Sequence, residues 1–426
     1  MEMQNAKGTR DISPENMIVK NKIIEVIRNI FERYGYSPLD TPILERYDVL
    51  ASKYAGGSEI LKETFRLKDQ GNRELALRYD LTVPLARYIA MNPAIKMPFK
   101  RYQIGEVFRD GPIKAGRYRQ FMQCDADAVG SNDLAMEAEQ MKIADTAFEE
   151  LGLSATIKFN NRKILDEIME KAGIPENLRI ESMLTIDKLE KIGTKKVIQE
   201  LTDKGVSAKS IETLMRLMER EIDNKETLDR LKDYIGETPG VVEVEELLRL
   251  LELFEVPAEF QPSLARGLAY YTGTVFEFYV DDSEIKSSAG AGGRYDNMIG
   301  DFAGNNQDYA AVGVSFGVDV ILEAYKEKHA VKKKSVVQAL IIPLNTYEES
   351  VKAMNYLREK GLNVDLSQKK GVSKGLEYAS YYGIPHAIII GEDEVKTGKY
   401  TVRDMETGQE EMLALEGAAK KIDRKS

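Results

Sequence analysis

Residues 107–130, VFRDGPIKAGRYRQFMQCDADAVG, predict two strands joined by a loop rich in glycine, proline and lysine. The edges of this loop carry Arg109, Arg117 and Arg119. Along the second strand, alternation places a largely polar set on one face: Arg119, Phe121, Gln123, Asp125 and Asp127. Because a strand normally turns its polar side to water, a solvated hairpin at a sheet edge is one interpretation. The other interpretation is that this face lines a site for a charged ligand.

The composition is that of an ordinary globular protein with two or three domains. The chain has 426 residues, of which 43% are hydrophobic and 31% are charged. No apolar run approaches the roughly 18 residues of a membrane span, and residues 1–17 lack a signal-peptide core. The single cysteine, Cys124, argues against a disulfide framework, so we expect a cytoplasmic location. The net charge of −10 leaves a nucleic-acid partner undecided.

Histidine is scarce, and this limits the chemistry that the chain can perform. Only His329 and His386 are present, and they are far apart in sequence. A zinc site built on histidines or a nucleophilic centre with a histidine base is therefore not expected. Arginine, lysine, carboxylates and tyrosine remain, which favours electrostatic stabilisation over covalent catalysis.

Helical and extended patterns alternate over the first 160 residues, and nearly all of residues 163–250 favours helix. The clearest elements expected before that stretch are a helix at 13–35, a hairpin at 64–79 turned at Gly71-Asn72, a helix at 80–92 and a helix at 133–150. Strand patterns return at 273–280 and after the glycine-rich segment 287–300. The simplest prediction is a helical insertion inside a β-rich domain.

The C-terminal part of the chain has a different pattern. A charged linker, EKHAVKKKS at residues 327–335, comes first. Beyond it, short apolar strands alternate with amphipathic helices, which predicts a small α/β domain with a parallel sheet. The sequence shows no internal repeat and no low-complexity tract.

No glycine-based nucleotide signature is present. The chain lacks G-x-x-x-x-G-K-[ST], and the glycine-rich segment fails G-x-G-x-x-G because Tyr295 occupies the last glycine position. ATP would therefore have to be bound by arginines, whose guanidinium groups fork onto two phosphate oxygens. Asp80, Gln123 and Asp127 suit an ammonium group instead. A ligand pair that requires both kinds of group is an amino acid and a polyphosphate.

A second cluster, LARGLAYYTGTVFEF at residues 264–278, places Arg266 directly before an apolar strand. Removing the partner of a buried charge costs about 3–5 kcal/mol, so an interior Arg266 needs an anion. The alternative is an amphipathic strand preceded by core tyrosines, which remains the better interpretation for Tyr270.

Taken together and in order, these segments resemble the histidyl-tRNA synthetase family of class II aminoacyl-tRNA synthetases. KGTRDISPE (7–15) is similar to the family's opening, and TPILE (41–45) with Pro42 to motif 1. The hairpin of the first paragraph resembles motif 2. RGLAYYTGTVFEF (266–278) and AGGRYDNM (291–298) resemble the two histidine-specific motifs, and VGVSFGVDVI (312–321) occupies the motif 3 position.

The resemblance implies an α+β fold: a class II antiparallel sheet flanked by helices, with a helical insertion and a C-terminal α/β anticodon-binding domain. The boundaries expected are a catalytic core at 1–162 and 251–326, an insertion at 163–250, a linker at 327–336 and an anticodon-binding domain at 337–426. The implied partners are histidine, ATP with Mg²⁺, tRNA(His), and a second copy through motif 1. In the last domain, Lys369, Lys370 and Lys374 could contact tRNA or form a solvated charged face.

Residue by residue, the resemblance implies roles for each motif position. Arg109 would hold the α-phosphate and the histidine carboxylate, and Arg117, beside Lys114, would hold the β- and γ-phosphates. Arg266 would stabilise charge at the α-phosphorus. The residues expected to surround histidine itself are Asp80, Thr82 and Gln123 at the amino group, Asp127 and Tyr271 at the imidazole, and Tyr295 closing the pocket. For Asp125 and Arg119 we expect structural ion pairs.

The chain departs from the family's pattern at two positions. Ala269 replaces the usual acidic residue, and Val320 replaces the motif 3 arginine that grips the γ-phosphate. Three alternatives follow: a synthetase-like regulatory subunit of ATP phosphoribosyltransferase, a class II synthetase for another amino acid, and a tRNA-sensing domain without catalysis. Residues 337–426 and the three arginines, Arg109, Arg117 and Arg266, count against the first alternative.

Overall fold

The computed structural model describes residues 3–52, 59–113, 116–266, 270–304, 309–330 and 333–423. Two compact units account for them. The first comprises the segment through Arg10 together with Ile23–Lys328, and the second comprises Asp11–Lys22 and the chain from His329 onward. None of the helices in these ranges is both long enough and apolar enough to cross a membrane.

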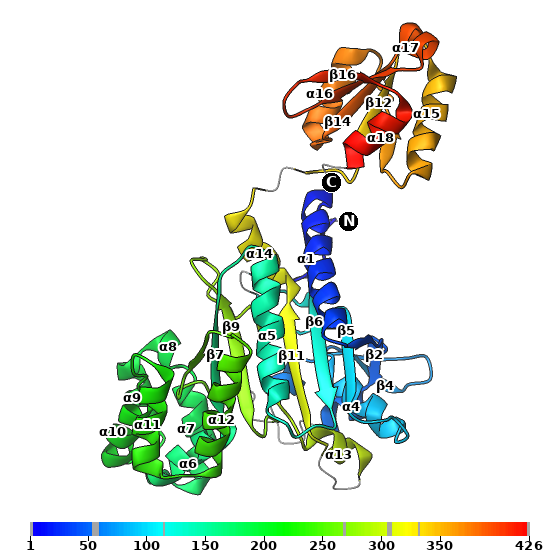
Figure 1. Cartoon of the computed structure of the whole chain (residues 1–426). Coiled ribbons are helices and arrows are strands. Elements are labelled where there is room, and N and C mark those ends of the chain that lie inside the picture. Colours follow the sequence, from blue (N-terminus) through cyan, green and yellow to red (C-terminus); the bar gives the residue numbers. More distant parts are fainter. Residues whose placement is uncertain are drawn as a thin grey trace. The chain divides into compact units, whose positions relative to one another are not determined.

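An eight-stranded sheet forms the centre of the first unit (Figure 1). Its strands in spatial order are β1 (Ser37–Pro38), β5 (Phe99–Phe108), β6 (Gln120–Val129), β11 (Ala311–Gly317), β10 (Gly290–Arg294), β9 (Thr274–Val280), β7 (Ala155–Asn161) and β8 (Ala258–Phe260). All neighbours are antiparallel except the two edge pairs, β1 with β5 and β7 with β8. The predicted antiparallel sheet is therefore confirmed. The quoted hairpin is β5–β6, and β6 lies inside the sheet rather than at its edge.

Helices α1 (Pro14–Arg33) and α5 (Ala135–Glu150) cover one face of this sheet (Figure 1). The ring centroids of Phe31 in α1 and Phe316 in β11 lie 5.9 Å apart, and those of Phe148 in α5 and Phe278 in β9 lie 5.6 Å apart. Both helices were predicted from apolar residues at helical spacing, and both predictions are confirmed. The opposite face of the sheet carries the polar side chains.

A small three-stranded sheet and short helices complete this part of the unit. Its order is β2 (Leu44–Arg46), β4 (Glu74–Leu77) and β3 (Arg66–Lys68). The predicted hairpin is confirmed, and the chain turns through Asn72, whose φ of 58° suits an asparagine. The accompanying helices are α2 (Tyr47–Ser52), α3 (Glu59–Lys62), α4 (Thr82–Met91), α13 (Met298–Ala303) and α14 (Val318–Lys328). Helix α4 confirms the helix predicted at 80–92.

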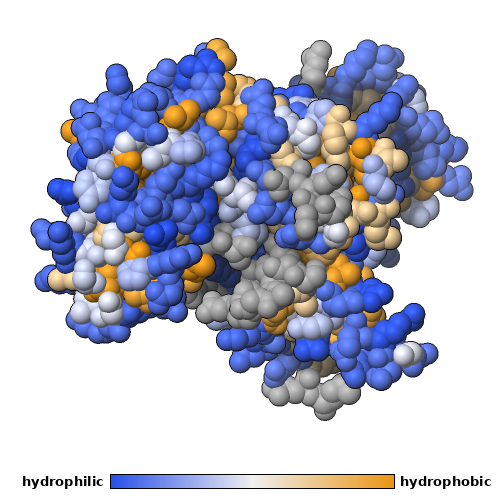
Figure 2. All heavy atoms as spheres, turned by 90° about the horizontal axis from the view of Figure 1, so that it is seen from below, coloured by the Kyte–Doolittle hydropathy of each residue, from blue (hydrophilic) through white to orange (hydrophobic). Residues whose placement is uncertain are grey.

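Seven helices follow β7 and precede β8, which confirms the predicted helical insertion. They are α6 (Arg162–Lys171), α7 (Glu176–Ile186), α8 (Leu189–Ile192), α9 (Thr194–Asp203), α10 (Ala208–Met218), α11 (Asn224–Ile235) and α12 (Pro239–Leu253). Side chains of the preferred capping types accept backbone N–H groups at four of the N-termini: Asn161, Ser207, Asp223 and Thr238. The surface seen in Figure 2 is mainly hydrophilic and is hollowed between this insertion and the rest of the first unit.

The second unit contains a five-stranded sheet with helices. Its elements after the linker are β12 (Ala339–Pro343), α15 (Tyr347–Glu359), β13 (Val364–Leu366), α16 (Val372–Tyr382), β14 (His386–Ile390), α17 (Glu392–Thr397), β15 (Tyr400–Asp404), β16 (Glu410–Leu413) and α18 (Leu415–Asp423). Strands β13, β12 and β14 are parallel, as predicted. The prediction of a wholly parallel sheet is wrong, because β15 and β16 add an antiparallel hairpin. Asp404 closes the turn by accepting the N–H groups of Glu406 and Thr407, and Gly408 supplies a φ of 73°.

Candidate active site

The polar face of the quoted hairpin is buried inside the sheet. Asp125 and Asp127 of β6 are only 2% and 3% exposed. Strand β5 places Arg101 opposite Asp127, and β11 places Gly313 on its other side. The interpretation of a solvated edge hairpin is therefore wrong, and this face must satisfy its charges within the protein or with a ligand.

Glycines on the two strands beyond β6 make room for these side chains. A Cβ at Gly313 would come within 2.1 Å of Asp127 Oδ1. A Cβ at Gly293 of β10 would lie 2.9 Å from the ring of Tyr271. Gly313 of β11 therefore leaves room for Asp127, and Gly293 of the glycine-rich segment leaves room for Tyr271.

A buried ion pair lies at the centre of this face. Arg101 is 0% exposed, and its Nη2 lies 2.8 Å from Asp127 Oδ2. The same nitrogen donates to the carbonyl of Leu81 at 3.0 Å, and the Tyr295 hydroxyl donates to Asp127 Oδ1 at 2.5 Å. Burial, followed by the charge of Asp127, raises the pKa of Tyr295, which keeps its hydroxyl a donor. Sequence analysis missed Arg101, which lies fully buried in β5.

Gln123 and Asp125 both form hydrogen bonds with the hydroxyl of Ser315, a residue that sequence analysis also missed. Ser315 of β11 donates to Asp125 Oδ1 at 2.5 Å and accepts from Gln123 Nε2 at 2.7 Å. Burial and then Asp127 raise the pKa of Asp125 to about 7. The expected ion pair of Asp125 is thus wrong, since its carboxylate contacts a hydroxyl. The Oε1 atom of Gln123 is buried and accepts no hydrogen bond in the described part of the chain.

The start of α4 brings two further predicted residues to this cluster. Asp80 Oδ1 accepts the backbone N–H of Val83 at 2.9 Å, and Thr82 is the first residue of the helix. Leu81 between them receives the bond from Arg101. The negative charge of Asp80 contributes to the raised pKa of Asp125, which places the two carboxylates near each other.

The three arginines predicted in motif 2 differ in their contacts and in their exposure to solvent. The guanidinium of Arg109 lies 4.2 Å from the ring centroid of Tyr79 and 5.0 Å from that of Phe121, and its Nε donates to the Tyr79 carbonyl at 3.2 Å. Arg117 is exposed. Arg119 pairs with Asp110 at 2.8 Å, which confirms its structural role. Lys114 and Ala269 lie outside the described residues.

The aromatic pair after Arg266 faces the same cluster. The ring centroids of Tyr270 and Tyr271 lie 4.3 Å apart. Burial raises the pKa of both hydroxyls, that of Tyr270 to about 12, and the charge of Asp127 contributes to the rise for Tyr271. Tyr271 therefore stands close to Asp127, as the sequence motif requires.

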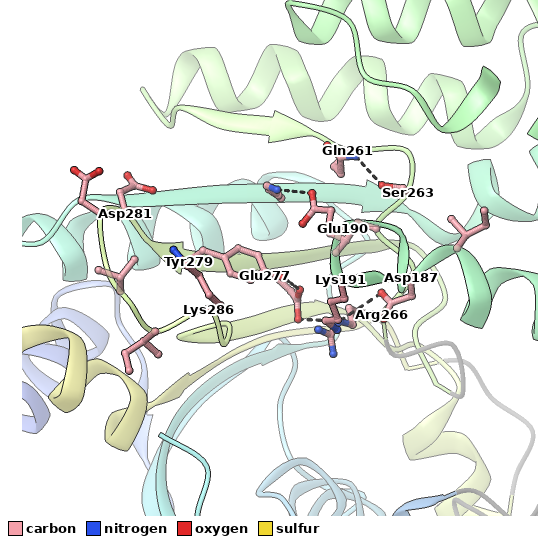
Figure 3. Close-up of a pocket in the computed structure, with 16 residues that line it drawn as sticks. Asp187, Glu190, Lys191, Gln261, Ser263, Arg266, Glu277, Tyr279, Asp281 and Lys286 are labelled. Carbon is pink, nitrogen blue, oxygen red and sulfur yellow. Dashed lines mark hydrogen bonds and ion pairs between the residues drawn. The ribbon is translucent and has the colours of Figure 1, made fainter. Parts of the chain in front are cut away.

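Arg266 lies at one end of a cavity on the same sheet face (Figure 3). Its Nε is 3.2 Å from Glu277 Oε1 in β9 and 3.5 Å from Asp187 Oδ1, directly after α7. The cavity has a volume of about 660 Å³ and lies between β9 and the helical insertion. Glu277, Ala291 and Ser315 stand side by side across β9, β10 and β11, and Ser315 stands beside Asp125. At about 4.8 Å per strand, Glu277 and Asp125 are about 14 Å apart.

Val320 stands at the position where the resembling family's motif 3 carries an arginine. Its side chain is 8% exposed and packs under Gly116 of the hairpin loop. The neighbouring Asp319 is held by Arg10 at 2.9 Å and by the backbone N–H of Met122 at 2.9 Å. Near motif 3 the site is therefore apolar at Val320, and the carboxylate of Asp319 is already bound by Arg10 and by the backbone of Met122.

Comparisons with known proteins agree with the motifs. A family described as histidyl-tRNA synthetase matches residues 8–321, and a family described as anticodon binding domain matches residues 338–425. Histidine–tRNA ligase 1 of Bacillus cereus is 44% identical over 417 residues, covering 96% of this chain and 97% of that protein.

Solved structures show the same fold. The histidyl-tRNA synthetase of Nostoc sp. PCC 7120 matches with a TM-score of 0.88 and 29% identity, covering 100% of both chains. A structure from Bacillus halodurans, described as an ATP phosphoribosyltransferase regulatory subunit/histidyl-tRNA synthetase, matches with a TM-score of 0.76 and 22% identity over 91% of this chain and 98% of that one. At this identity the second likeness concerns the fold alone.

The Arg101–Asp127 pair predicts a stability effect. Asp127→Ala should lower the free energy of unfolding by about 3–5 kcal/mol, because it leaves the Arg101 charge buried without its partner. Urea unfolding measures this loss, and Arg101→Leu combined with Asp127→Ala should recover most of it. The control is Asp110→Ala, whose partner Arg119 is 26% exposed, with an expected loss below about 1 kcal/mol. A loss as small as the control's would contradict the pairing.

Proposed function

Because the chain belongs to the histidyl-tRNA synthetase family, we propose that it activates histidine with ATP and transfers the histidyl group to tRNA(His). The observation that carries the proposal is the sheet face that the Asp127 cluster and Arg266 share. The Asp127 end offers carboxylates and amides, and the other end offers Arg266 beside Glu277 and Asp187. The Asp127 end can bind the ammonium group of histidine, and the Arg266 end can bind the phosphates of ATP. The two substrates would therefore lie next to each other on this face.

The first step is a displacement at phosphorus. A carboxylate oxygen of histidine attacks the α-phosphorus, the bond to the bridging oxygen breaks, and pyrophosphate leaves with that electron pair. No general base is needed because the attacking carboxylate is already ionised. Positioning and cationic groups therefore supply the catalysis. In the second step a ribose hydroxyl of the tRNA takes the histidyl group, and AMP leaves.

The arginines take the roles that this chemistry requires. Arg109, whose guanidinium lies near the rings of Tyr79 and Phe121, is held where its N–H groups can meet the α-phosphate and the histidine carboxylate. Arg266 is catalytic and stabilises the charge that develops at the α-phosphorus. Arg117 is exposed on the loop and binds the β- and γ-phosphates.

The Asp127 cluster binds the amino acid. Asp80, Thr82 and Gln123 face the α-amino group, and the partnerless Oε1 of Gln123 is an acceptor suited to an ammonium N–H. Asp127 accepts the imidazole N–H. A carboxylate has about four lone-pair sites, so the bond from Tyr295 and the contact with Arg101 leave room for a ligand. Tyr271 pairs with the second ring nitrogen, and Tyr295 closes the pocket by holding Asp127.

Magnesium enters with ATP in this proposal. The described residues contain no group of three or more His, Cys, Asp or Glu side chains suited to a metal ion. Magnesium bound to a nucleotide needs only one or two protein carboxylates, because phosphates and water complete its shell. Glu277 and Asp187 beside Arg266 meet that requirement. The ion would neutralise charge on the triphosphate.

The remaining parts of the proposal concern the other domains and the assembly. The core is taken as 1–162 and 251–326, the insertion as 163–250, the linker as 327–336 and the anticodon-binding domain as 337–426. A homodimer in the cytoplasm is expected to form through the motif 1 region. Ile43 and Leu44 support this interface, since both apolar side chains are exposed, by 44% and 49%, beside the edge strand β2. The regulatory-subunit alternative is not favoured by the relatives, whose names are those of histidine–tRNA ligases.

Arg266→Ala should lower histidine-dependent ATP–pyrophosphate exchange by at least about 10²-fold, the scale for losing one preorganised transition-state donor. The control is Arg249→Ala, an exposed arginine of α12 that pairs only within its own helix, with Glu246 at 2.7 Å. Near-wild-type exchange in a folded Arg266→Ala variant would contradict the catalytic assignment.

A charge reversal in the second unit tests the tRNA partner. Lys369, Lys370 and Lys374 are exposed around the start of α16. Changing all three to Glu should raise the KM for tRNA at least about 10-fold by turning attraction to phosphates into repulsion, while exchange stays unchanged. The matched control is Lys420→Glu, an exposed lysine of α18. Equal tRNA charging by the triple variant and the control would show that this face does not bind tRNA.

A further inference from the structure

The cavity beside Arg266 contains a lysine to which the roles above assign nothing. Lys191 belongs to α8 of the helical insertion and lines the cavity together with Arg266, Asp187 and Glu277. Figure 3 shows Lys191 alongside Arg266, at the end of the cavity where Asp187 and Glu277 also point. The insertion therefore brings a cation to the same place as the catalytic arginine of the core.

The other two lysines of this cavity have partners in the protein. Lys158 pairs with Glu190 at 2.6 Å, and Lys286 donates to the Ser283 carbonyl at 2.9 Å. In the described part of the chain no carboxylate lies within ion-pair distance of Lys191, and Asp187 and Glu277, which line the cavity with it, are engaged by Arg266. A cation in this position is available to an incoming anion.

The charges around Lys191 are of both signs. Burial lowers the pKa of Lys191 most, and the positive charge of Arg266 lowers it next, whereas Asp187 and Glu277 raise it. Lys191 of the insertion and Arg266 of the core line the same end of the cavity. A polyphosphate carries several negative charges and can contact both cations at once.

At the motif 3 position, the proposed triphosphate site has no arginine. Val320 stands where the resembling family has the arginine that grips the γ-phosphate, and it is buried under Gly116. We propose that Lys191 of the helical insertion binds the pyrophosphate end of ATP and supplies the positive charge that Val320 cannot. This inference rests on the proposed function and adds a triphosphate-binding residue from outside the core.

Through Lys191, the helical insertion would take part in the reaction of histidine with ATP. Asp187 lies in the short turn between α7 and α8, and Lys191 lies in α8. When the phosphates enter, Lys191 moves onto them with its flexible stem, and Arg266 exchanges its contact with Asp187 for one with the α-phosphate. ATP binding therefore tightens the insertion against the core, and release of pyrophosphate loosens it.

Lys191→Met is the direct test, because methionine has an unbranched side chain of similar length to that of lysine and carries no charge. The KM for ATP in histidine-dependent exchange should rise about 10-fold or more, the scale for losing one charged hydrogen bond, while the KM for histidine changes less than about 2-fold. Lys191→Arg should retain most of the wild-type ATP affinity. The matched control is Lys188→Met in the same turn, whose lysine pairs with Glu200 at 2.7 Å and does not line the cavity.

An unchanged KM for ATP in Lys191→Met would overturn the inference, as would an equal rise in Lys188→Met or an equal rise in the KM for histidine. Calorimetric titration with tripolyphosphate separates this inference from the proposed function. Weaker binding to Lys191→Met than to wild type and Lys188→Met would support the lysine even if the wild type showed no histidine-dependent exchange. Equal binding to all three proteins would contradict it.

Discussion

Charges buried on one face of the eight-stranded sheet govern the rest of the structure. The other face is aromatic and is closed by α1 and α5, with Phe316 between Phe31 and Phe148. Apolar helices cannot close the charged face in the same way, since Arg101, Asp125 and Asp127 would be stranded. These charges are instead paired with one another, and glycines on the neighbouring strands leave space for a ligand. The candidate active site is a consequence of this buried, charged face.

The arrangement also explains how a chain with two histidines can be an enzyme of this family. Attack by an ionised carboxylate needs no histidine base, and the required groups are cations that hold phosphates and acceptors that hold an ammonium. Arg109 and Arg266 are positioned by stacking and by carboxylates, respectively. Lys191 extends the set of cations from the core into the insertion, so that two segments of the chain meet at the triphosphate.

Local pattern predicted much of this site, and long-range pairing decided the rest. The alternation along residues 119–127 placed Gln123, Asp125 and Asp127 on one face, and Asp80 was predicted at a helix start because such residues accept N–H groups there. Ser315 could not be placed, because its contact with Gln123 joins residues 192 positions apart on neighbouring strands. Arg101 could not be assigned a partner without the register of β5 against β6, and Lys191 could not be placed without the packing of the insertion on the core. The hairpin β15–β16 was missed for a related reason, since its charged strands lack the apolar alternation that marked the others.

Amino-acid-dependent ATP–pyrophosphate exchange by the intact chain, run with each of the twenty amino acids, tests the central claim most directly. The account predicts exchange with histidine alone, because the side-chain pocket satisfies both imidazole nitrogens and leaves buried polar groups unpaired with any other side chain. Exchange with a different amino acid, or no exchange with any of the twenty, would contradict it.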